Sequence, residues 1–356
     1  MESLGNFPDP FLAEIVAQPE AIRRAAAAMA EQRDVLDRVR DAATGRTLIF
    51  TGMGSSYDAC YPIVTDLARH GALALLADAA ELLHFRRPIL TAATLVVIVS
   101  QSGESAEIVR LATELSTLSA PPPIVSITNG LDNSLARRAG LRLDTRAGAE
   151  TGPSTKTFVA SLTMLAGLTR VLEGDDADTA ADGLGADVAD AARAAERLLA
   201  DPVKLAVRLA AHLRGRDVIF LLGRGAARAA AEMGALTMKE SGVMAESLES
   251  GMFRHGPLEL AGPGMSAIVV TTEPETRALD LSLAGELVEA GAAVLVVSPD
   301  GEWPDGAYGV ATGFDDRTLA SAVSVLPVQL LAWKFSSEAG RTPGSFTRAS
   351  KVTTRE

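Results

Sequence analysis

The 356-residue chain has little cysteine, few aromatic residues and no long apolar run, and each of these absences excludes a class of protein. Cys60 is the only cysteine, so no disulfide can form within the chain, which favours a reducing compartment. The first residues, MESLGNFPDPFLAEI, lack the basic start and apolar core of a secretory signal. No uncharged apolar stretch is long enough to cross a bilayer. We therefore expect a cytoplasmic protein with no membrane partner.

Positive charge is also scarce, because 33 Lys and Arg residues stand against 45 Asp and Glu residues and the net charge is −12. Binding to a nucleic-acid backbone requires clustered Lys and Arg, so we expect no nucleic-acid partner. The acidity does not exclude a small phosphorylated ligand, whose charge can be met locally by hydroxyl and backbone N–H groups. Hydrophobic residues make up 47% of the chain and aromatic residues 4%, which predicts a large and mainly aliphatic core.

Short apolar runs alternate with longer helical patterns along the chain, which is typical of βαβ units and a parallel sheet. The stretches RTLIFTGMGSS and RDVIFLLGRGAAR each predict a strand, a glycine turn and the start of a helix. Gly54 and Gly225 hold matching places in the two turns, 225 − 54 = 171 residues apart, and Ser100 and Thr271 keep the same offset. The sequence therefore predicts an α/β protein with two doubly wound lobes, each a parallel β-sheet flanked by helices.

The composition between and beyond the two copies divides the chain further. An acidic, alanine-rich stretch, EGDDADTAADGLGADVADAARAAERLLADP, predicts a connecting helix between the lobes. The tail GRTPGSFTRASKVTTRE is polar and contains Gly and Pro, which predicts an irregular extension. The predicted segments are an N-terminal helical segment (1–45), a first lobe (46–172), a linker helix (173–205), a second lobe (206–340) and a C-terminal tail (341–356).

Two hydroxyl-rich loops follow predicted strands of the first lobe, which is where open α/β sheets bind ligands. One is GMGSSYD and the other is SQSGES, and each precedes a predicted helix whose free N–H groups suit an anion. Serine and glycine are also ordinary helix caps and turn formers, so each loop alone has a purely structural alternative. The matching second-lobe loops, GRGAAR and TTEPET, contain fewer hydroxyls, which favours one anion site in the first lobe. The candidate residues are Ser55, Ser56, Ser100, Gln101, Ser102 and Ser105.

These loops resemble those of the sugar isomerase (SIS) domain. The two-lobed arrangement is similar to the isomerase half of glutamine:fructose-6-phosphate amidotransferase and to its deaminase and deglycase relatives. The resemblance covers almost the whole chain, from AEIVAQPEAI through GAETGPSTKTF, MKES and AESLESGMFRHGPLEL to SKVTTRE. It implies two SIS lobes with a tail over the active site. It also implies that the six candidate residues hold the 6-phosphate of a sugar, that Ser154 contacts the sugar, and that Glu104 directs its charge away from the phosphate.

The same resemblance assigns catalytic roles to three ionisable residues. It implies that His255, in the loop RHGP, opens the sugar ring, a step suited to a group with a pKa near neutrality. Glu240, in MKES, would move a proton between neighbouring sugar carbons, and Lys351, in the tail, would complete the site. Glu246 is a candidate supporting residue. The chain shows no Cys/His/Asp cluster at metal-ligand spacing, so we expect no metal and no organic cofactor.

Two positions depart from the amidotransferase pattern. Thr237 and Met233 stand one and two turns before Glu240, where the helix of that family carries a Lys and a Glu. Residue 2 is Glu2 rather than the nucleophilic cysteine of a glutaminase domain. We therefore expect a phosphosugar isomerase/deaminase similar to glucosamine-6-phosphate deaminase, acting on an amino-sugar or ketose 6-phosphate. The alternatives are a fructosamine-6-phosphate deglycase and a non-catalytic sugar-phosphate sensor, and the resemblance also implies a homodimer with shared active sites.

Overall fold

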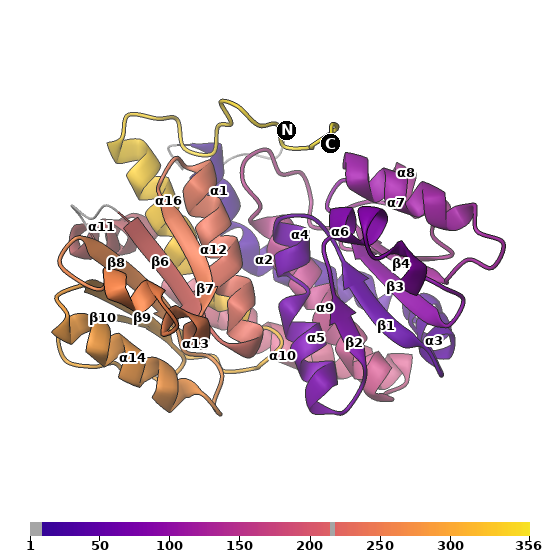
Figure 1. The fold of residues 1–356 in the computed structure, drawn as a ribbon, viewed down its shortest axis with the longest axis horizontal. Helices are drawn as coiled ribbons and strands as arrows, with labels where there is room; N and C mark the ends of the chain where they lie inside the picture. The colour runs from indigo at the N-terminus through magenta and orange to yellow at the C-terminus, as the bar shows by residue number, and fades with distance from the viewer. Residues whose placement is uncertain (1–8, 214–217) are drawn as a thin grey trace. The chain divides into compact units, whose positions relative to one another are not determined.

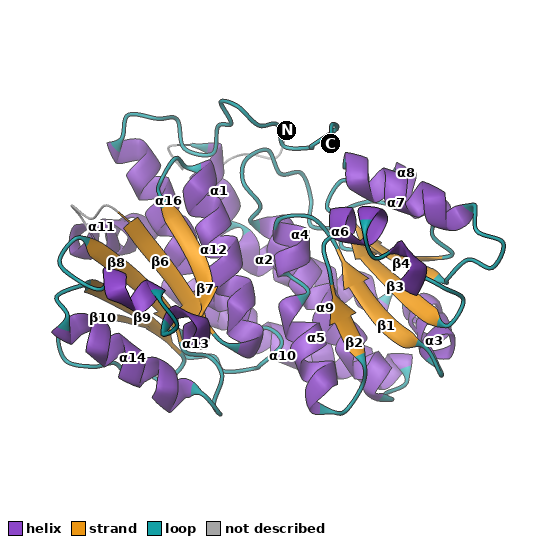
Figure 2. Ribbon diagram, in the orientation of Figure 1, coloured by secondary structure: helices purple, strands orange, loops and turns teal. Residues whose placement is uncertain are grey.

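The computed structural model describes residues 9–213 and 218–356, which contain two five-stranded parallel β-sheets with helices around each (Figure 1, Figure 2). Residues 1–8 of the predicted N-terminal segment, and residues 214–217, which include the start of the run RDVIFLL, lie outside the described residues. The described residues form two compact units that are not continuous in sequence. The first-sheet unit contains Glu20–Ala149, Lys156–Ala189 and Thr347–Glu356, and the second-sheet unit contains 9–19, Glu150–Thr155 and Asp190–Phe346.

The first sheet is built from strands β1 (Thr47–Thr51), β2 (Ala74–Leu76), β3 (Thr94–Val99), β4 (Ile124–Thr128) and β5 (Leu141–Asp144). Its helices are α3 (Arg33–Ala43), α4 (Ser55–Asp58), α5 (Tyr61–Arg69), α6 (Ala79–His84), η1 (Arg87–Ile89), α7 (Ala106–Ser116), α8 (Ser134–Arg138) and α9 (Lys156–Glu173). The strand order is β2-β1-β3-β4-β5 with every pairing parallel. Apolar side chains of α6, α7 and α8 form one core with the strands, whereas α3 and α5 pack with α9.

The second sheet repeats this plan with strands β6 (Val218–Gly223), β7 (Ala245–Glu249), β8 (Met265–Val270), β9 (Ala293–Ser298) and β10 (Tyr308–Ala311). Its helices are α11 (Pro202–Leu213), η2 (Gly225–Ala227), α12 (Arg228–Glu240), α13 (Ser250–Phe253), η3 (Pro257–Leu260), α14 (Arg277–Glu289), α15 (Ala320–Ser324) and α16 (Leu326–Glu338). The order β7-β6-β8-β9-β10 is the first sheet's order in its second copy. The predicted α/β fold with two doubly wound lobes is therefore confirmed.

Strand β6 shows why the central strands are apolar throughout. Ile219 and Leu221 join a core with side chains of α11, α12 and α16, while Phe220 and Leu222 join a second core with α14 on the opposite face. Successive side chains of a strand point to opposite faces, and here both faces are covered by helices. The run from Ile219 to Leu222 is therefore buried on both faces of the sheet.

The register of the strands reproduces the 171-residue offset of the sequence repeat. Thr47 pairs with Thr94 in the first sheet, and Val218 pairs with Met265 in the second. Both members of the second pair lie 171 positions after their counterparts. The duplication predicted from the glycine turns is therefore a duplication of strand pairing as well.

The N-terminal segment and the predicted linker are helical, whereas the tail after α16 contains no helix or strand. The N-terminal segment contains α1 (Pro10–Val16), α2 (Gln18–Ala30) and α3, and the predicted linker contains α10 (Ala177–Leu198) and the start of α11. In the second-sheet unit, Asp9 accepts a hydrogen bond from Nε1 of Trp333 at 2.6 Å, and Gln18 donates to Oε1 of Gln329 at 2.6 Å. These two bonds link α1 and its flanks to α16, although more than 300 residues separate the partners.

Among residues 9–213 and 218–356, no helix combines the length and the apolar character needed to cross a bilayer. Cys60 is fully buried, and this burial raises the pKa of its thiol. A thiol that stays protonated in the core is a packing group rather than a nucleophile.

Two helical glycines lead to opposite expectations for the same substitution. A Cβ atom at Gly234 in α12 would lie 2.7 Å from Cδ2 of Leu221 and 2.8 Å from Cγ1 of Val328. We expect Gly234→Ala to lower the free energy of unfolding by about 1–3 kcal/mol, because core side chains must move apart. Gly185 in α10 has no such neighbour within 4 Å, and Gly185→Ala should raise that free energy by roughly 0.5–1 kcal/mol. Denaturant unfolding measures both, and an equal gain at the two positions would contradict the packing described for α12.

Candidate functional site

The two serine loops follow β1 and β3, which are neighbours in the first sheet although β2 lies between them in the chain. At such a switch point the connections leave the sheet in opposite directions, and open parallel sheets bind ligands there, at the carboxyl ends of the strands. Ser55 and Ser56 begin α4 after the β1 turn, and the loop 100–105 joins β3 to α7. The six predicted anion-binding residues therefore share one edge of one sheet.

Hydrogen bonds within the loop 100–105 hold its shape. The hydroxyl oxygen of Ser100 accepts a bond from Gly103 N at 3.1 Å, and that of Ser102 accepts one from Glu104 N at 3.1 Å. Gly103 has φ +64, a left-handed conformation that glycine adopts without strain. Ser105 is the N-cap residue of α7 and makes no side-chain cap hydrogen bond, so its hydroxyl does not serve the end of the helix.

The negative charge of Glu104 is engaged by a neighbouring helix. Its carboxylate accepts a hydrogen bond from Ser134 N, the first residue of α8, at 2.6 Å and lies 3.8 Å from Nη2 of Arg137. The bond from Ser134 keeps the pKa of this carboxyl below its usual value. The one acidic residue of the serine loop is thus bound to α8, as an anion site in this loop requires.

The C-terminal tail is tied to the same part of the first-sheet unit. The carbonyl oxygen of Thr353 accepts a hydrogen bond from Ala106 N, at the start of α7, at 3.0 Å. The carboxylate of Glu356 lies 2.8 Å from Nη1 of Arg110 and 3.6 Å from Nε2 of His84. Lys351 is half-buried and stands two positions before Thr353. Thr353 and Glu356 therefore attach the end of the tail, which includes Lys351, to α7.

The other predicted polar residues lie in the second-sheet unit. Ser154 lies in the segment 150–155, and its carbonyl oxygen accepts a hydrogen bond from Nε2 of Gln329 at 3.3 Å. Glu240 is the last residue of α12 and is half-buried. Glu246 is exposed on β7, with its carboxylate 3.8 Å from Nζ of Lys239. Glu246 is therefore engaged with a surface lysine of its own unit.

The two departures from the amidotransferase pattern are buried on α12. Met233 and Thr237 are both fully buried, and the hydroxyl of Thr237 donates a hydrogen bond to Met233 O at 2.9 Å. A hydroxyl that is bonded to its own helix is satisfied and carries no charge. These two positions therefore contribute no ionisable group.

His255 lies on an exposed turn between α13 and η3. Its backbone N–H donates to Met252 O at 3.0 Å, and Gly256 follows with φ +128, a conformation open to glycine. Met252 and Leu260 on the same segment are 59% and 58% exposed. The histidine is thus presented on the surface of its unit and is accompanied by apolar side chains.

At the switch point of the second sheet, between β6 and β8, the chain supplies its own anion. Glu273, three residues after β8, is 2% exposed, and its Oε1 accepts a hydrogen bond from Ala226 N at 2.9 Å. Arg224, directly after β6, lies 3.0 Å from the carboxylate of buried Asp280 and 3.4 Å from that of Glu249. The sequence alone did not predict this role of Glu273. The acidic residue of TTEPET, placed soon after a predicted strand, is the feature that could have indicated it.

Each unit thus contains part of the predicted site. The first-sheet unit brings together the two serine loops and the tail that carries Lys351. The second-sheet unit carries Ser154, Glu240 and His255, on a connecting segment, a helix end and a surface turn. The catalytic and binding roles of all these residues stay predictions.

Comparison with known proteins gives one family and several relatives. The model of the SIS domain family matches the chain twice, at residues 43–169 and 212–336. Over 367 residues the chain is 28% identical to glutamine–fructose-6-phosphate aminotransferase (isomerizing) of Pyrobaculum aerophilum, an alignment that covers 100% of this chain and 59% of the relative. The chain therefore spans less than two thirds of that protein's length.

Solved structures share the same architecture. The C-terminal domain of glucosamine-fructose-6-phosphate aminotransferase from Francisella tularensis has a TM-score of 0.85 at 23% identity, covering 97% of this chain and 99% of that one. Glucosamine-6-phosphate deaminase from Thermotoga maritima has a TM-score of 0.69 at 20% identity, covering 92% and 99%. At these identities the likeness shows the fold, with two lobes of the SIS type.

We expect Gly103→Ala to weaken binding of a 6-phosphosugar, because a Cβ atom there would lie 2.0 Å from Oδ1 of Asn133. An alanine in the left-handed conformation of residue 103 would also be strained by about 1 kcal/mol. The loop 100–105 must therefore change shape, and we expect the affinity for the phosphosugar to fall by roughly tenfold or more. Titration calorimetry with glucosamine 6-phosphate measures the loss. Gly140→Ala is the matched control, since a Cβ atom at Gly140 meets no atom within 4 Å. A folded Gly103→Ala variant that binds as tightly as the parent would exclude this loop from the site.

Proposed function

The chain belongs to the SIS domain family, and on that basis we propose that it is an enzyme that binds a phosphorylated sugar or amino sugar and interconverts its aldose and ketose forms. The observation that supports this most is the pair of serine loops at the switch point of the first sheet. Hydroxyl groups, a helix start and a diverted acidic side chain at one place suit a small phosphate group.

In this proposal the phosphate lies against the loop 100–105 and the start of α7. That helix is 11 residues long, and the partial positive charge of its N-terminus favours an anion. The hydroxyl oxygens of Ser100 and Ser102 accept hydrogen bonds from the backbone, which leaves the O–H group of each to donate to a phosphate oxygen. Neutral donors of this kind can bind a phosphate in a chain whose net charge is −12.

The second sheet supports a single phosphate site per chain. There the carboxylate of Glu273 already accepts a bond from the backbone at the start of η2, through Ala226 N. A phosphate in this position would meet a buried negative charge, which costs far more than the gain from a helix start. The two copies of one fold therefore offer one ligand position.

The chemistry of the proposed reaction is proton transfer. Ring opening needs a proton donor and acceptor at the ring oxygen, a role we assign to His255, and isomerisation needs a base that moves a proton between C1 and C2, a role we assign to Glu240. Lys351 would balance negative charge on the enolate-like intermediate. These steps use acids and bases, and the exposed turn of His255 is suited to reach a bound sugar.

The finer proposal is a glucosamine-6-phosphate deaminase/isomerase, which releases ammonia from the amino sugar and forms the ketose phosphate. The uncharged pair Met233 and Thr237 supports an amine-handling environment different from that of the amidotransferases. A fructosamine-6-phosphate deglycase is the alternative within the same chemistry. A non-catalytic sugar-phosphate sensor is the alternative outside it, and the loss of two ionisable positions on α12 is the observation that favours it.

The surface around His255 supports a homodimer with shared active sites. Met252 and Leu260 expose most of their surface beside this histidine, and exposed apolar side chains that gather on one segment favour a protein interface. In the proposal this segment of one subunit packs against the other and delivers His255 to its site.

The substrate is tested with glucosamine 6-phosphate and the purified chain. We expect fructose 6-phosphate and ammonia in equal amounts, with water as the second reactant. Glu240→Gln keeps the shape of the side chain but removes the base, so kcat should fall by about 10²–10⁴-fold, whereas exposed Lys239→Gln should leave it unchanged. Turnover of fructosamine 6-phosphate alone would favour the deglycase. Binding without turnover of any 6-phosphosugar would favour the sensor and contradict the enzyme.

Shared sites predict that two inactive variants complement each other. His255→Ala and Glu240→Gln chains, each inactive alone, should regain activity after subunit exchange, because a hybrid dimer contains one site with both native residues. Co-purification of differently tagged chains establishes that exchange has occurred. If hybrids form and no activity returns, the histidine and the glutamate of one site come from the same chain.

A further inference from the structure

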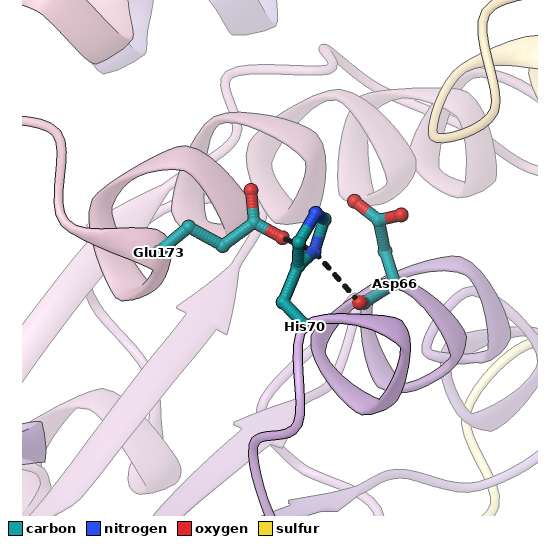
Figure 3. Close-up of side chains that lie close together, drawn as sticks. All are labelled: Asp66, His70 and Glu173. Atoms are coloured by element: carbon teal, nitrogen blue, oxygen red, sulfur yellow. Dashed lines mark hydrogen bonds and ion pairs between the residues drawn. The ribbon is translucent and has the colours of Figure 1, made fainter.

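Three side chains that commonly ligate metals converge where α5 and α9 end, apart from the serine loops (Figure 3). Asp66 lies in the last turn of α5, and His70 is the C-cap residue of that helix, four positions later. Glu173 is the last residue of α9, which packs against α5. One ligand atom from each residue lies within 4.8 Å of the other two.

The imidazole ring of His70 lies between the two carboxylates in Figure 3. Its Nδ1 is 2.6 Å from Oε1 of Glu173 and 3.1 Å from the backbone carbonyl oxygen of Asp66. These contacts turn Nδ1 toward an oxygen atom of Glu173, so an ion that takes the place of a proton between them has Nδ1 and the Glu173 carboxylate as neighbouring ligands. The spacing of Asp66 and His70 places both side chains on one side of the helix end.

Negative potential accumulates at this place from several sources. Two carboxylates share it, and the C-termini of two helices add partial negative charge. The pKa of the Glu173 carboxyl is raised, first by its burial and then by the Asp66 carboxylate. The positive charge nearest to them is that of Arg69, whose Nη1 lies 3.7 Å from Oδ1 of Asp66. A divalent cation between the carboxylates would remove their repulsion and would be attracted by the partial negative charge of both helix C-termini.

We propose that Asp66, His70 and Glu173 form a binding site for a divalent transition-metal ion of the zinc class. One imidazole nitrogen and two carboxylate oxygens are zinc ligands at about 2.0–2.2 Å, whereas Mg²⁺ and Ca²⁺ prefer oxygen alone. The side chain of His70 is 60% exposed, so water can complete the coordination.

The place of Asp66, His70 and Glu173 relative to the first sheet indicates what the ion would do. After His70 the chain enters β2, at the amino end of that strand, while the serine loops lie at the carboxyl ends of β1 and β3. The ion therefore joins the ends of α5 and α9 and stabilises the first-sheet unit, and it takes no part in sugar chemistry. This inference stands or falls independently of the proposed reaction.

Titration of ZnCl₂ into the purified, untagged chain tests the site. We expect one Zn²⁺ to bind per chain, and saturating zinc to raise Tm by roughly 2–4 °C, with no comparable rise in MgCl₂. His70→Ala and Glu173→Gln should each weaken zinc binding by at least about tenfold. His84→Ala is the matched control, since His84 is also partly exposed and lies 3.6 Å from a carboxylate of Glu356, and it should bind zinc as the parent does.

The competing account is an ion pair between His70 and Glu173 that holds no metal. It predicts no heat of zinc binding and no zinc-dependent change in Tm, and that result overturns the proposal. Equal zinc affinity in the parent and in folded His70→Ala and Glu173→Gln chains also overturns it, because the ion then binds elsewhere. Circular dichroism checks the fold, and if His70→Ala does not fold, Asp66→Asn beside Glu173→Gln decides in the same way.

Discussion

The switch in direction between β1 and β3 is the constraint on which the proposed site depends. In a parallel sheet every strand-to-helix loop emerges at the same edge, and neighbouring loops normally cover one another. Where two adjacent strands send their helices to opposite faces, the loops diverge and their backbone N–H groups stay accessible. The order β2-β1-β3 produces this divergence, and the two serine loops occupy it. Gly103 and the hydroxyls of the loop 100–105 determine the local shape of the loop at this position, but the strand order creates the position.

Duplication presents the same constraint twice, and the chain meets it in two ways. A helix start leaves N–H groups that need an acceptor. In the second sheet Glu273 provides that acceptor from within the chain, and Arg224, two positions before Ala226, pairs with Asp280 and Glu249. In the first sheet the carboxylate of Glu104, the only acidic residue of the loop 100–105, accepts its hydrogen bond from α8. In the second sheet a carboxylate of the chain itself occupies the anion position, whereas the loop of the first sheet suits an anionic ligand.

Long-range contacts give the first-sheet unit two further features. The tail returns to α7 through Thr353 and Glu356, and Lys351 lies two positions before Thr353. At the other edge, Glu173 comes to Asp66 and His70 from a helix that begins 86 residues after His70, at Lys156. The first of these belongs to the proposed sugar site, whereas the second concerns only how two helix ends are held together.

The sequence by itself determined the fold class, the duplication and the place of the serine loops. These depend on local periodicity, on glycine turns and on an offset that strand pairing preserves, all of which can be recognised along the chain. It also indicated Glu240, His255 and Lys351, through a resemblance and not through any visible contact among them. Only the tertiary structure decided that Glu104 binds α8, that Glu273 fills the second helix start, and that Glu173 meets His70. The partners in these three contacts are 30, 47 and 173 − 70 = 103 residues apart. No local pattern specifies such pairs, because the packing of helices on a sheet selects them.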